Sequence, residues 1–312
     1  MAARAERLPG VGMALIACGL IVVGLAGCRS TGEFGPQARC AIAPQAGVPE
    51  IIAHVNQNTA RIQSWRALNA AITSPDLPVS ISASVAVEPP RNFRLVARSP
   101  FGPEVDLGSN PEHYWFWARQ DESKRIYLAR HERTTDQSSV RLARPATEGP
   151  VGGMPFEPEW IMEAMGVIAM DPGRVREIRR DPQAGIVTLE EQRVSPAGEP
   201  VFKLTAIDLC HGLVREHALY DAKQQLIARA TLREHVRDTS GSQAVLPAKI
   251  DLVWPMARIN MTMRMGAIEI NQGNIPKSTF AVQQYSGSEV FNVGGTSAGV
   301  DRPIVESTSG FE

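Results

Sequence analysis

Alternation of apolar and polar residues with a period of two recurs along most of this chain and limits the folds open to it. Residues 79–87 carry valine, isoleucine or alanine at every odd position, with Ser80, Ser82 and Ser84 between them. Such alternation is typical of a strand with one buried face and one face in water. Because short turns with Gly, Pro or Asp separate the segments, we expect an antiparallel sheet. About eleven or twelve strands are predicted, at residues 66–72, 79–87, 93–97, 104–107, 113–118, 126–128, 184–193, 201–208, 212–220, 225–237, 247–254 and 258–269.

Two segments have a helical period instead. The apolar side chains of residues 49–63 fall on one stripe, and Pro49 suits the first turn of a helix. A second, short helix is predicted at about residues 157–168, with an apolar stripe made of Trp160, Ile161, Ala164, Met165 and Val167. The polar and then Gly/Pro-rich residues 134–155 before it are predicted to form a loop.

The same patterns divide the chain into a tether, one domain and a tail. Residues 28–47 have no hydrophobic period and carry Gly and Pro at intervals, which is typical of a flexible linker. No internal repeat and no domain break interrupts residues 48–285, so a single domain is predicted there. Residues 286–312 are predicted to be a mobile tail.

Residues 1–27 have the composition of an export signal. Arg4 and Arg7 precede an apolar run from Val11 to Leu25. This run is shorter than the ~20 residues of a membrane-spanning helix and ends at small residues without a basic stop. A cleaved signal peptide is therefore predicted, and an uncleaved signal anchor is the alternative.

The stretch Leu25-Ala26-Gly27-Cys28 resembles the lipobox of bacterial lipoprotein signal peptides. The resemblance implies that Cys28 is acylated, with chains such as palmitate, and becomes the first residue of a mature lipoprotein. Two or three acyl chains hold a protein lastingly on a membrane, at about 0.8 kcal/mol per buried methylene. Arg29 stands where inner-membrane lipoproteins of some bacteria carry Asp. The outer membrane, on its periplasmic side, is therefore favoured over the inner membrane.

Charge and cysteine content restrict the partners and the chemistry. A formal net charge of -1 offers no electrostatic basis for binding nucleic acid. Of the 4 cysteines, Cys18 lies in the signal and Cys28 is the lipidation candidate. The remaining Cys40 and Cys210 either form a disulfide, as an oxidising compartment permits, or stay free. No CxxC or Cys/His spacing indicates a metal, and we expect no cofactor.

The order of lipobox, N-terminal helix, meandering strands and a helix inserted midway resembles the LolA/LolB-like lipoprotein localisation superfamily. Residues 107–117 (LGSNPEHYWFW) look like the aromatic hairpin of such proteins, and residues 268–280, with Ile275-Pro276 and Phe280, are similar to their closing segment. The resemblance covers residues 48–285. It implies an open, strongly curved antiparallel sheet, an incomplete barrel, with helices as a lid, and it implies binding of a lipid or a lipoprotein acyl group.

The concave wall of an open barrel suits an acyl chain. The predicted lining combines residues of the sheet with residues of the lid helix, whose methionines adapt to varied apolar partners. It consists of Val85, Leu95, Leu107, Trp160, Ile161, Met162 and Met165. The alternative is that these residues form an ordinary core filled by side chains, in a lipoprotein with only a structural or interaction role.

Four aromatic residues follow one another at Tyr114, Trp115, Phe116 and Trp117. In a strand, one pair of these must face outward. An outward tryptophan pair suits a lipid interface or another envelope protein. Cover by the linker or by a helix is the alternative.

Support for catalysis is weak. Residues 295–299 (GTSAG) match the nucleophile-elbow string, but they lie in a Gly/Ser-rich tail without the strand and helix that this motif needs. Glu190 and Glu191 point to opposite faces of a strand, and the histidines have no metal-binding spacing. We therefore expect a non-enzymatic, lipid-anchored envelope protein that binds a hydrophobic ligand in lipoprotein sorting or lipid transfer. An envelope hydrolase is the less favoured alternative.

Overall fold

A single sheet of 15 strands makes up most of the protein. The computed structural model describes residues 40–75, 79–131, 158–194, 200–255 and 259–292. In sheet order the strands are β15 (Glu289–Asn292), β6 (Arg125–Arg130), β5 (His113–Ala118), β4 (Gly102–Ser109), β3 (Asn92–Ser99), β2 (Ile81–Glu88), β1 (Trp65–Thr73), β13 (Ile259–Arg264), β12 (Val245–Trp254), β11 (Leu226–Arg237), β10 (Leu213–Tyr220), β9 (Pro200–Asp208), β8 (Ile186–Val194) and β7 (Val175–Asp181), with β14 (Ile268–Ile270) also pairing with β1.

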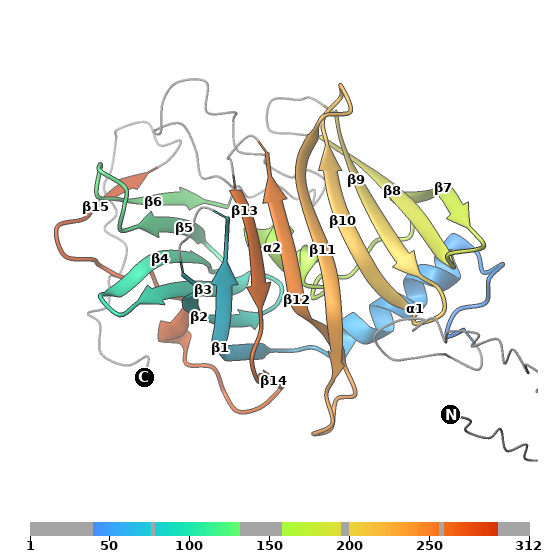
Figure 1. The fold of residues 1–312 in the computed structure, drawn as a ribbon, viewed down its shortest axis with the longest axis horizontal. Helices are drawn as coiled ribbons and strands as arrows, with labels where there is room; N and C mark the ends of the chain where they lie inside the picture. The colour runs from blue at the N-terminus through green and yellow to red at the C-terminus, as the bar shows by residue number, and fades with distance from the viewer. Residues whose placement is uncertain (1–39, 76–78, 132–157, 195–199, 256–258, 293–312) are drawn as a thin grey trace, which may run out of the picture.

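The strands form two antiparallel meanders, β1–β6 and β7–β13, which are joined where β1 pairs with β13. Strand β15 adds to β6 in parallel. The sheet is unclosed, with β7 and β15 at its two edges. Figure 1 shows that it curves, so that β2–β6 run across the direction of β10–β12, with helix α2 (Pro158–Ala164) behind β12 and β13. The predicted fold class, a mainly β open sheet with an N-terminal helix and an inserted helix, is confirmed.

Helix α1 spans Val48–Ala60 and contacts β7 at the end of the sheet. Pro49 lies in its first turn, and its buried stripe is Ile51, Ile52, Val55 and Thr59. The helix ends before the predicted residue 63. There the side chain of Asn271 accepts hydrogen bonds from the backbone N–H groups of Gln63 and Ser64, at 2.8 and 3.0 Å, as the chain turns into β1.

The predicted strand 258–269 is interrupted in the structure. It forms β13 and β14, and both pair with β1, whose own pairing with β2 shifts between Ala67 and Ala70. Gly266 lies in the interruption, where a Cβ atom would come within 2.3 Å of the Asn69 side chain. The register shift in β1 and this close approach mark an irregularity of the sheet at this point.

Two strands were not predicted. Strand β7 (VREIRRD) has charged residues on both faces, as edge strands often do, and so it has no alternating pattern. Strand β15 lies within residues 286–312, which were predicted to be a mobile tail. Its residues Glu289–Asn292 pair with β6 from Arg125 to Leu128. The prediction is therefore wrong for these residues, because a strand only four residues long gains its order from its partner; residues 293–312 lie outside the described part.

The prediction of a flexible linker at residues 28–47 is wrong for residues 40–47, and residues 28–39 lie outside the described part. Residues 40–47 lie against the domain, with Ile42 and Ala46 each 3% exposed. The backbone N–H groups of Ala41 and Ile42 donate to the carbonyls of Cys210 and Leu209, both at 2.9 Å. These contacts come from the distant β9–β10 turn, so they left no periodic signal in the sequence.

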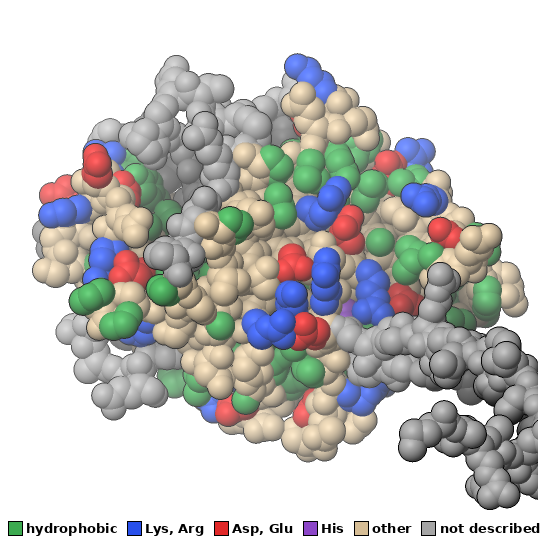
Figure 2. Space-filling model, viewed as in Figure 1, with side chains coloured by type: hydrophobic (Ala, Val, Ile, Leu, Met, Phe, Trp, Pro, Cys, Tyr) green, Lys and Arg blue, Asp and Glu red, His purple; other side chains and the backbone are tan. Residues whose placement is uncertain are grey.

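The outer face of the sheet is polar over β11–β13. Figure 2 shows basic and acidic side chains intermixed there. Arg233 pairs with Asp251 at 3.3 Å, and Arg264 pairs with Glu234. The apolar side chains of these strands are therefore on the concave face, which positions the candidate site.

Candidate functional site

The predicted lining residues all lie in one buried cluster between the concave face and α2. Strands β2, β3 and β4 supply Val85, Leu95 and Leu107, which are cross-strand neighbours. Helix α2 and the residue that follows its end supply the others. The exposed fractions are 1% for Val85, 5% for Leu95, 2% for Leu107, 3% for Trp160, 2% for Ile161, 0% for Met162 and 1% for Met165. In this structure α2 therefore closes the concave face.

Small side chains of the sheet and large side chains of α2 share this space. Buried alanines recur on the sheet side of the cluster, at Ala67, Ala70, Ala83, Ala97, Ala228 and Ala230. Trp160 of α2 belongs to the same cluster and packs edge-on against Trp254, with ring centroids 5.0 Å apart. The helix therefore shares this core with both small and large side chains of the sheet.

A charged cluster lies under the same helix. Arg193 on β8 binds both carboxylate oxygens of Glu163 on α2, at 3.0 Å from Nη1 and 2.8 Å from Nη2. Lys203 on β9 donates to the Oε2 atom of Glu163 at 2.9 Å. Glu191 completes the group by accepting a second hydrogen bond from Nη2 of Arg193 at 2.8 Å. Two acids and two bases are thus held in direct contact, and bidentate pairing gives the arrangement a defined geometry.

Strand periodicity explains why these charges point inward. Arg193 is in phase with the buried Val187 and Leu189 on β8, and Lys203 is in phase with the buried Val201 and Ile207 on β9. This cluster was not predicted from the sequence. A charged residue in phase with buried apolar residues was the available signal, but it required knowing which face was concave.

The two neighbouring glutamates of β8 have different partners. Glu190 pairs with Arg176 of β7 at 2.5 Å, and the Arg176 side chain is 74% exposed. Glu191 pairs with Arg193, whose side chain is 8% exposed. Both observations agree with the expectation that these glutamates point to opposite faces.

Electrostatics keep the Glu163 carboxyl ionised. Burial by itself would raise its pKa, but the ammonium of Lys203 and the guanidinium of Arg193 outweigh burial and lower the pKa from 4.5 to about 2. Burial lowers the pKa of Lys203 below its usual value, and Glu163 opposes this effect. For Arg193, burial opposes the charged form, whereas Glu163 and Glu191 raise the pKa above its usual range. The cluster therefore depends on Glu163 for its charge balance.

Three buried side-chain nitrogen atoms of α2, β8 and β10 have no hydrogen-bond partner among the described residues. They are Nε1 of Trp160, Nε of Arg193 and Nε2 of His217. His217 lies on β10, and its Nδ1 atom is 3.1 Å from the hydroxyl of Thr205. Burial, with the charge of Lys203 nearby, lowers the pKa of His217 from 6.5 to about 3, so its ring is neutral at pH 7.

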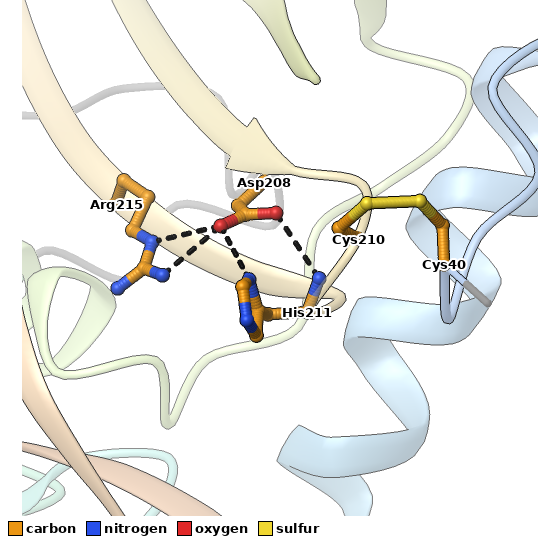
Figure 3. Close-up of a disulfide and its surroundings, with 5 residues drawn as sticks. All are labelled: Cys40, Asp208, Cys210, His211 and Arg215. Carbon is orange, nitrogen blue, oxygen red and sulfur yellow. Dashed lines mark hydrogen bonds and ion pairs between the residues drawn. A yellow bond between two sulfur atoms is a disulfide. The ribbon is translucent and has the colours of Figure 1, made fainter. Parts of the chain in front are cut away.

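Cys40 and Cys210 are joined by a disulfide in the structure. Figure 3 shows it beside the β9–β10 turn, where Asp208 accepts from His211 and Arg215. These bonds, at 2.8 and 3.0 Å, brace the turn that carries Cys210. The segment that leads into α1 is therefore attached to the sheet at residue 40.

Trp115 and Trp117 of β5 face outward but are covered. They are 0% and 6% exposed. Trp117 stacks on Tyr285, with ring centroids 3.7 Å apart, and its Nε1–H donates to Ser288 at 3.0 Å. The predicted exposed interface is therefore wrong for these two residues. Their cover comes from the segment between the 3₁₀ helix η2 (Lys277–Phe280) and β15, which neither alternative named.

Tyr114 and Phe116 occupy the opposite face of β5. They are partly exposed and pack against Tyr127 and Ala129 of β6. Phe116 also packs against the main core under α2. These two aromatics are therefore continuous with the concave face and not with an outer surface.

The described residues hold neither a metal cluster nor a spanning helix. No group of three or more His, Cys, Asp or Glu among them is placed to bind a metal ion. No helix among them is long and apolar enough to cross a membrane. Cys28, with the predicted signal peptide, and residues 295–299 lie outside the described part of the chain.

Comparisons with known proteins give similarity at the level of solved structures. No protein-family model and no curated protein sequence matches the chain. A domain from Vibrio parahaemolyticus described as outer membrane lipoprotein-sorting is 8% identical, with a TM-score of 0.48 over 76% of this chain and 97% of that chain. A DUF1329 family protein from Desulfovibrio piger is 11% identical, with a TM-score of 0.47 over 76% of this chain and 98% of that chain. A LolA superfamily protein from Nitrosomonas europaea is 11% identical, with a TM-score of 0.43 over 76% of this chain and 98% of that chain.

Proposed function

We propose that this chain is a lipid-anchored envelope protein that binds a hydrophobic ligand between α2 and the concave face of its sheet. The ligand is a lipid or a lipoprotein acyl group, and the role is lipoprotein sorting or lipid transfer without catalysis. The observation that carries the proposal is that the apolar side chains of α2 share one buried cluster with the concave face of the sheet. Trp160, Met162 and Met165 lie in this cluster together with wall residues such as Ala83 and Ala97.

Displacement of α2 would leave an apolar trough of the kind that an acyl chain fills. The helix has only seven residues, so few backbone hydrogen bonds hold it and packing supplies most of its stability. An acyl chain that replaces Trp160, Met162 and Met165 against the sheet regains the same apolar burial, at about 25 cal/mol per Å². The exchange is therefore close to neutral in hydrophobic energy, as a reversible carrier requires.

The anchor belongs to the same proposal. Cys28 carries the acyl chains, and the disulfide between Cys40 and Cys210 fixes the far end of the tether to the domain. The segment between Cys28 and Cys40 spans at most about 40 Å. The tether is thus shorter than residues 28–47 alone suggested, and it keeps the α1 end of the sheet close to the membrane.

Ligand binding is tested with the full chain reconstituted in phosphatidylcholine nanodiscs. We expect native mass spectrometry to find a bound acyl lipid, and hydrogen exchange of the α2 amides to rise when an acyl ligand is added. Amides of β10–β12 serve as the internal control and keep their protection. Absence of any bound acyl ligand, with unchanged exchange in α2, would support the filled-core alternative and reject the proposal.

The anchor is tested separately. Cys28→Ser is expected to remove acyl modification from the N-terminal peptide, as measured by mass spectrometry, and to prevent removal of residues 1–27. The matched control is Cys18→Ser, which lies within the predicted signal and should change neither. Normal processing of the Cys28→Ser chain would contradict the lipobox assignment.

The described residues include two contacts between a hydroxyl group and an imidazole, Ser109 with His131 and Thr205 with His217, and the second does not form a hydrolase triad. Thr205 and His217 lie in contact, yet Nε2 of His217 has no partner among the described residues, so no acid orients the ring there. A triad needs such a third group. Binding is therefore the function that we propose.

A further inference from the structure

The charge balance of the concave site depends on whether α2 is in place. With α2 docked, Glu163 and Glu191 face Arg193 and Lys203. When α2 leaves, Glu163 leaves with it, and two cations remain with one carboxylate. A buried charge without compensation is strongly unfavourable. A ligand that fills the trough with hydrocarbon alone would leave this net positive charge beneath it.

The unpaired N–H groups of this cluster indicate that a ligand group rich in hydrogen-bond acceptors would fit beside Arg193. Arg193 uses both of its Nη atoms on carboxylates, while its Nε–H has no acceptor among the described residues. When the Thr205 hydroxyl donates to Nδ1 of His217, the ring carries its proton on Nε2, which also lacks an acceptor there. Buried donors are rarely left without partners. The site therefore has capacity for more acceptor oxygens than Glu163 supplies.

The surrounding contacts confine this group to one end of the trough. Arg193, Lys203 and His217 come from the adjacent strands β8, β9 and β10 and are buried, and Leu219 is the cross-strand partner of Lys203. The apolar residues of β2–β4, where α2 contacts β4, are far from these strands in sheet order. A ligand that spans this face meets hydrocarbon at one end and cations at the other.

Resting on the proposed function, we infer that the ligand is an anionic amphiphile whose head group replaces the Glu163 carboxylate between Arg193 and Lys203. In this arrangement Glu163 is an internal competitor of the ligand, and α2 is displaced as the head group takes its ion pairs. The shared chemistry is a negatively charged oxygen group, a carboxylate or a phosphate, attached to an acyl chain.

Two probes that differ only in head-group charge test this inference. Parinaric acid and its methyl ester are titrated into nanodiscs that carry the full chain, and energy transfer from tryptophan reports occupancy near Trp160 and Trp254. Protein-free nanodiscs are the blank. We expect the acid to bind at least tenfold more tightly than the ester. Competition by lysophosphatidic acid, compared with lysophosphatidylcholine, then shows whether a phosphate head group is accepted as well as a carboxylate.

Variants locate the head group. Glu163→Gln removes the competitor and is expected to tighten binding of both probes several-fold, because both displace α2, while the preference for the acid is kept. Lys203→Met is expected to reduce the preference for the acid to about twofold or less. The matched control is Glu190→Gln, because Glu190 lies next to Glu191 on β8 but pairs with Arg176 on the other face. It should keep the preference of the unmodified protein.

The outcomes separate this inference from the proposed function. Equal affinity for acid and ester in the unmodified protein would overturn the inference while leaving acyl binding intact. Binding of neither probe would reject the proposed function as well. The comparison of acid with ester uses the unmodified protein, so it tests the inference even if a variant fails to fold. Weaker acid binding in Glu163→Gln, in a folded protein, would also overturn the inference.

Discussion

Glu163→Gln is expected to destabilise the folded protein by about 3 kcal/mol at pH 7. The magnitude follows from the pKa of the carboxyl, which is 4.5 as a reference and about 2 in the fold, at about 1.4 kcal/mol for each tenfold difference in acidity. A second route agrees, because removing one partner of a buried ion pair costs about 3–5 kcal/mol. The side chains of Arg193 and Lys203 are 8% and 3% exposed, so water does not replace the lost carboxylate.

The effect of this variant also depends on pH. Between about pH 4.5 and pH 2 the unfolded chain binds a proton at Glu163 and the folded chain does not. Folding stability from this group is therefore fully present above about pH 4.5 and is lost as the pH falls through the folded pKa of about 2. The difference between the unmodified protein and Glu163→Gln should shrink over the same range.

Urea unfolding of the full chain, followed by tryptophan fluorescence, measures the difference because Trp160 lies on the same helix as Glu163. Glu190→Gln is the control. Its partner Arg176 is 74% exposed, so we expect a change of less than about 1 kcal/mol. Lys203→Met in the Glu163→Gln background removes the uncompensated cation and should recover part of the loss. Equal losses for Glu163→Gln and its control, or additivity of Glu163→Gln and Lys203→Met within about 0.5 kcal/mol, would refute the reasoning.

Three further predictions concern other parts of the structure. Folding lowers the pKa of His217 from 6.5 to about 3, so the stability that the neutral ring contributes above pH 6.5 is lost as the pH falls toward 3. His217→Gln should therefore make the urea midpoint depend less on pH in that range. Cys40→Ser removes a disulfide between residues 170 apart and should lower the free energy of unfolding by about 2–5 kcal/mol. A reducing agent should lower the urea midpoint of the unmodified protein but not that of Cys40→Ser. Gly108→Ala would place a Cβ 2.0 Å from the Trp115 ring and should lower stability by about 1–3 kcal/mol; an unchanged melting temperature would contradict this packing.

Local periodicity was sufficient for most of the strands. In Ile81–Glu88 and Pro200–Asp208, apolar and polar residues alternate because one face of the strand is more buried than the other. Residues next to each other in the sequence are therefore enough to predict the strand. The same method failed at β7, whose charged residues occupy an edge and have no buried face to mark. It also failed at β15, which is ordered by pairing with β6, a strand far away in the sequence.

The candidate site was predicted only in its apolar part. Residues such as Val85 and Trp160 were found because hydrophobic side chains signal burial wherever they lie. Arg193 and Lys203 were missed because charged residues normally indicate an exposed face. Only the fold places Glu163 between them, and the three residues come from a helix and two strands that share no local pattern.

The sequence by itself determined the strand-rich class and the two helices, since each of these is encoded in the spacing of nearby residues. Tertiary structure alone decided which face of β5 is covered, that Cys40 is joined to Cys210, and that a buried ion cluster lies beneath α2. The physical reason is the same in each case. These features depend on contacts between segments that are distant along the chain, and burial, charge pairing and disulfide formation are properties of such contacts and not of sequence neighbours.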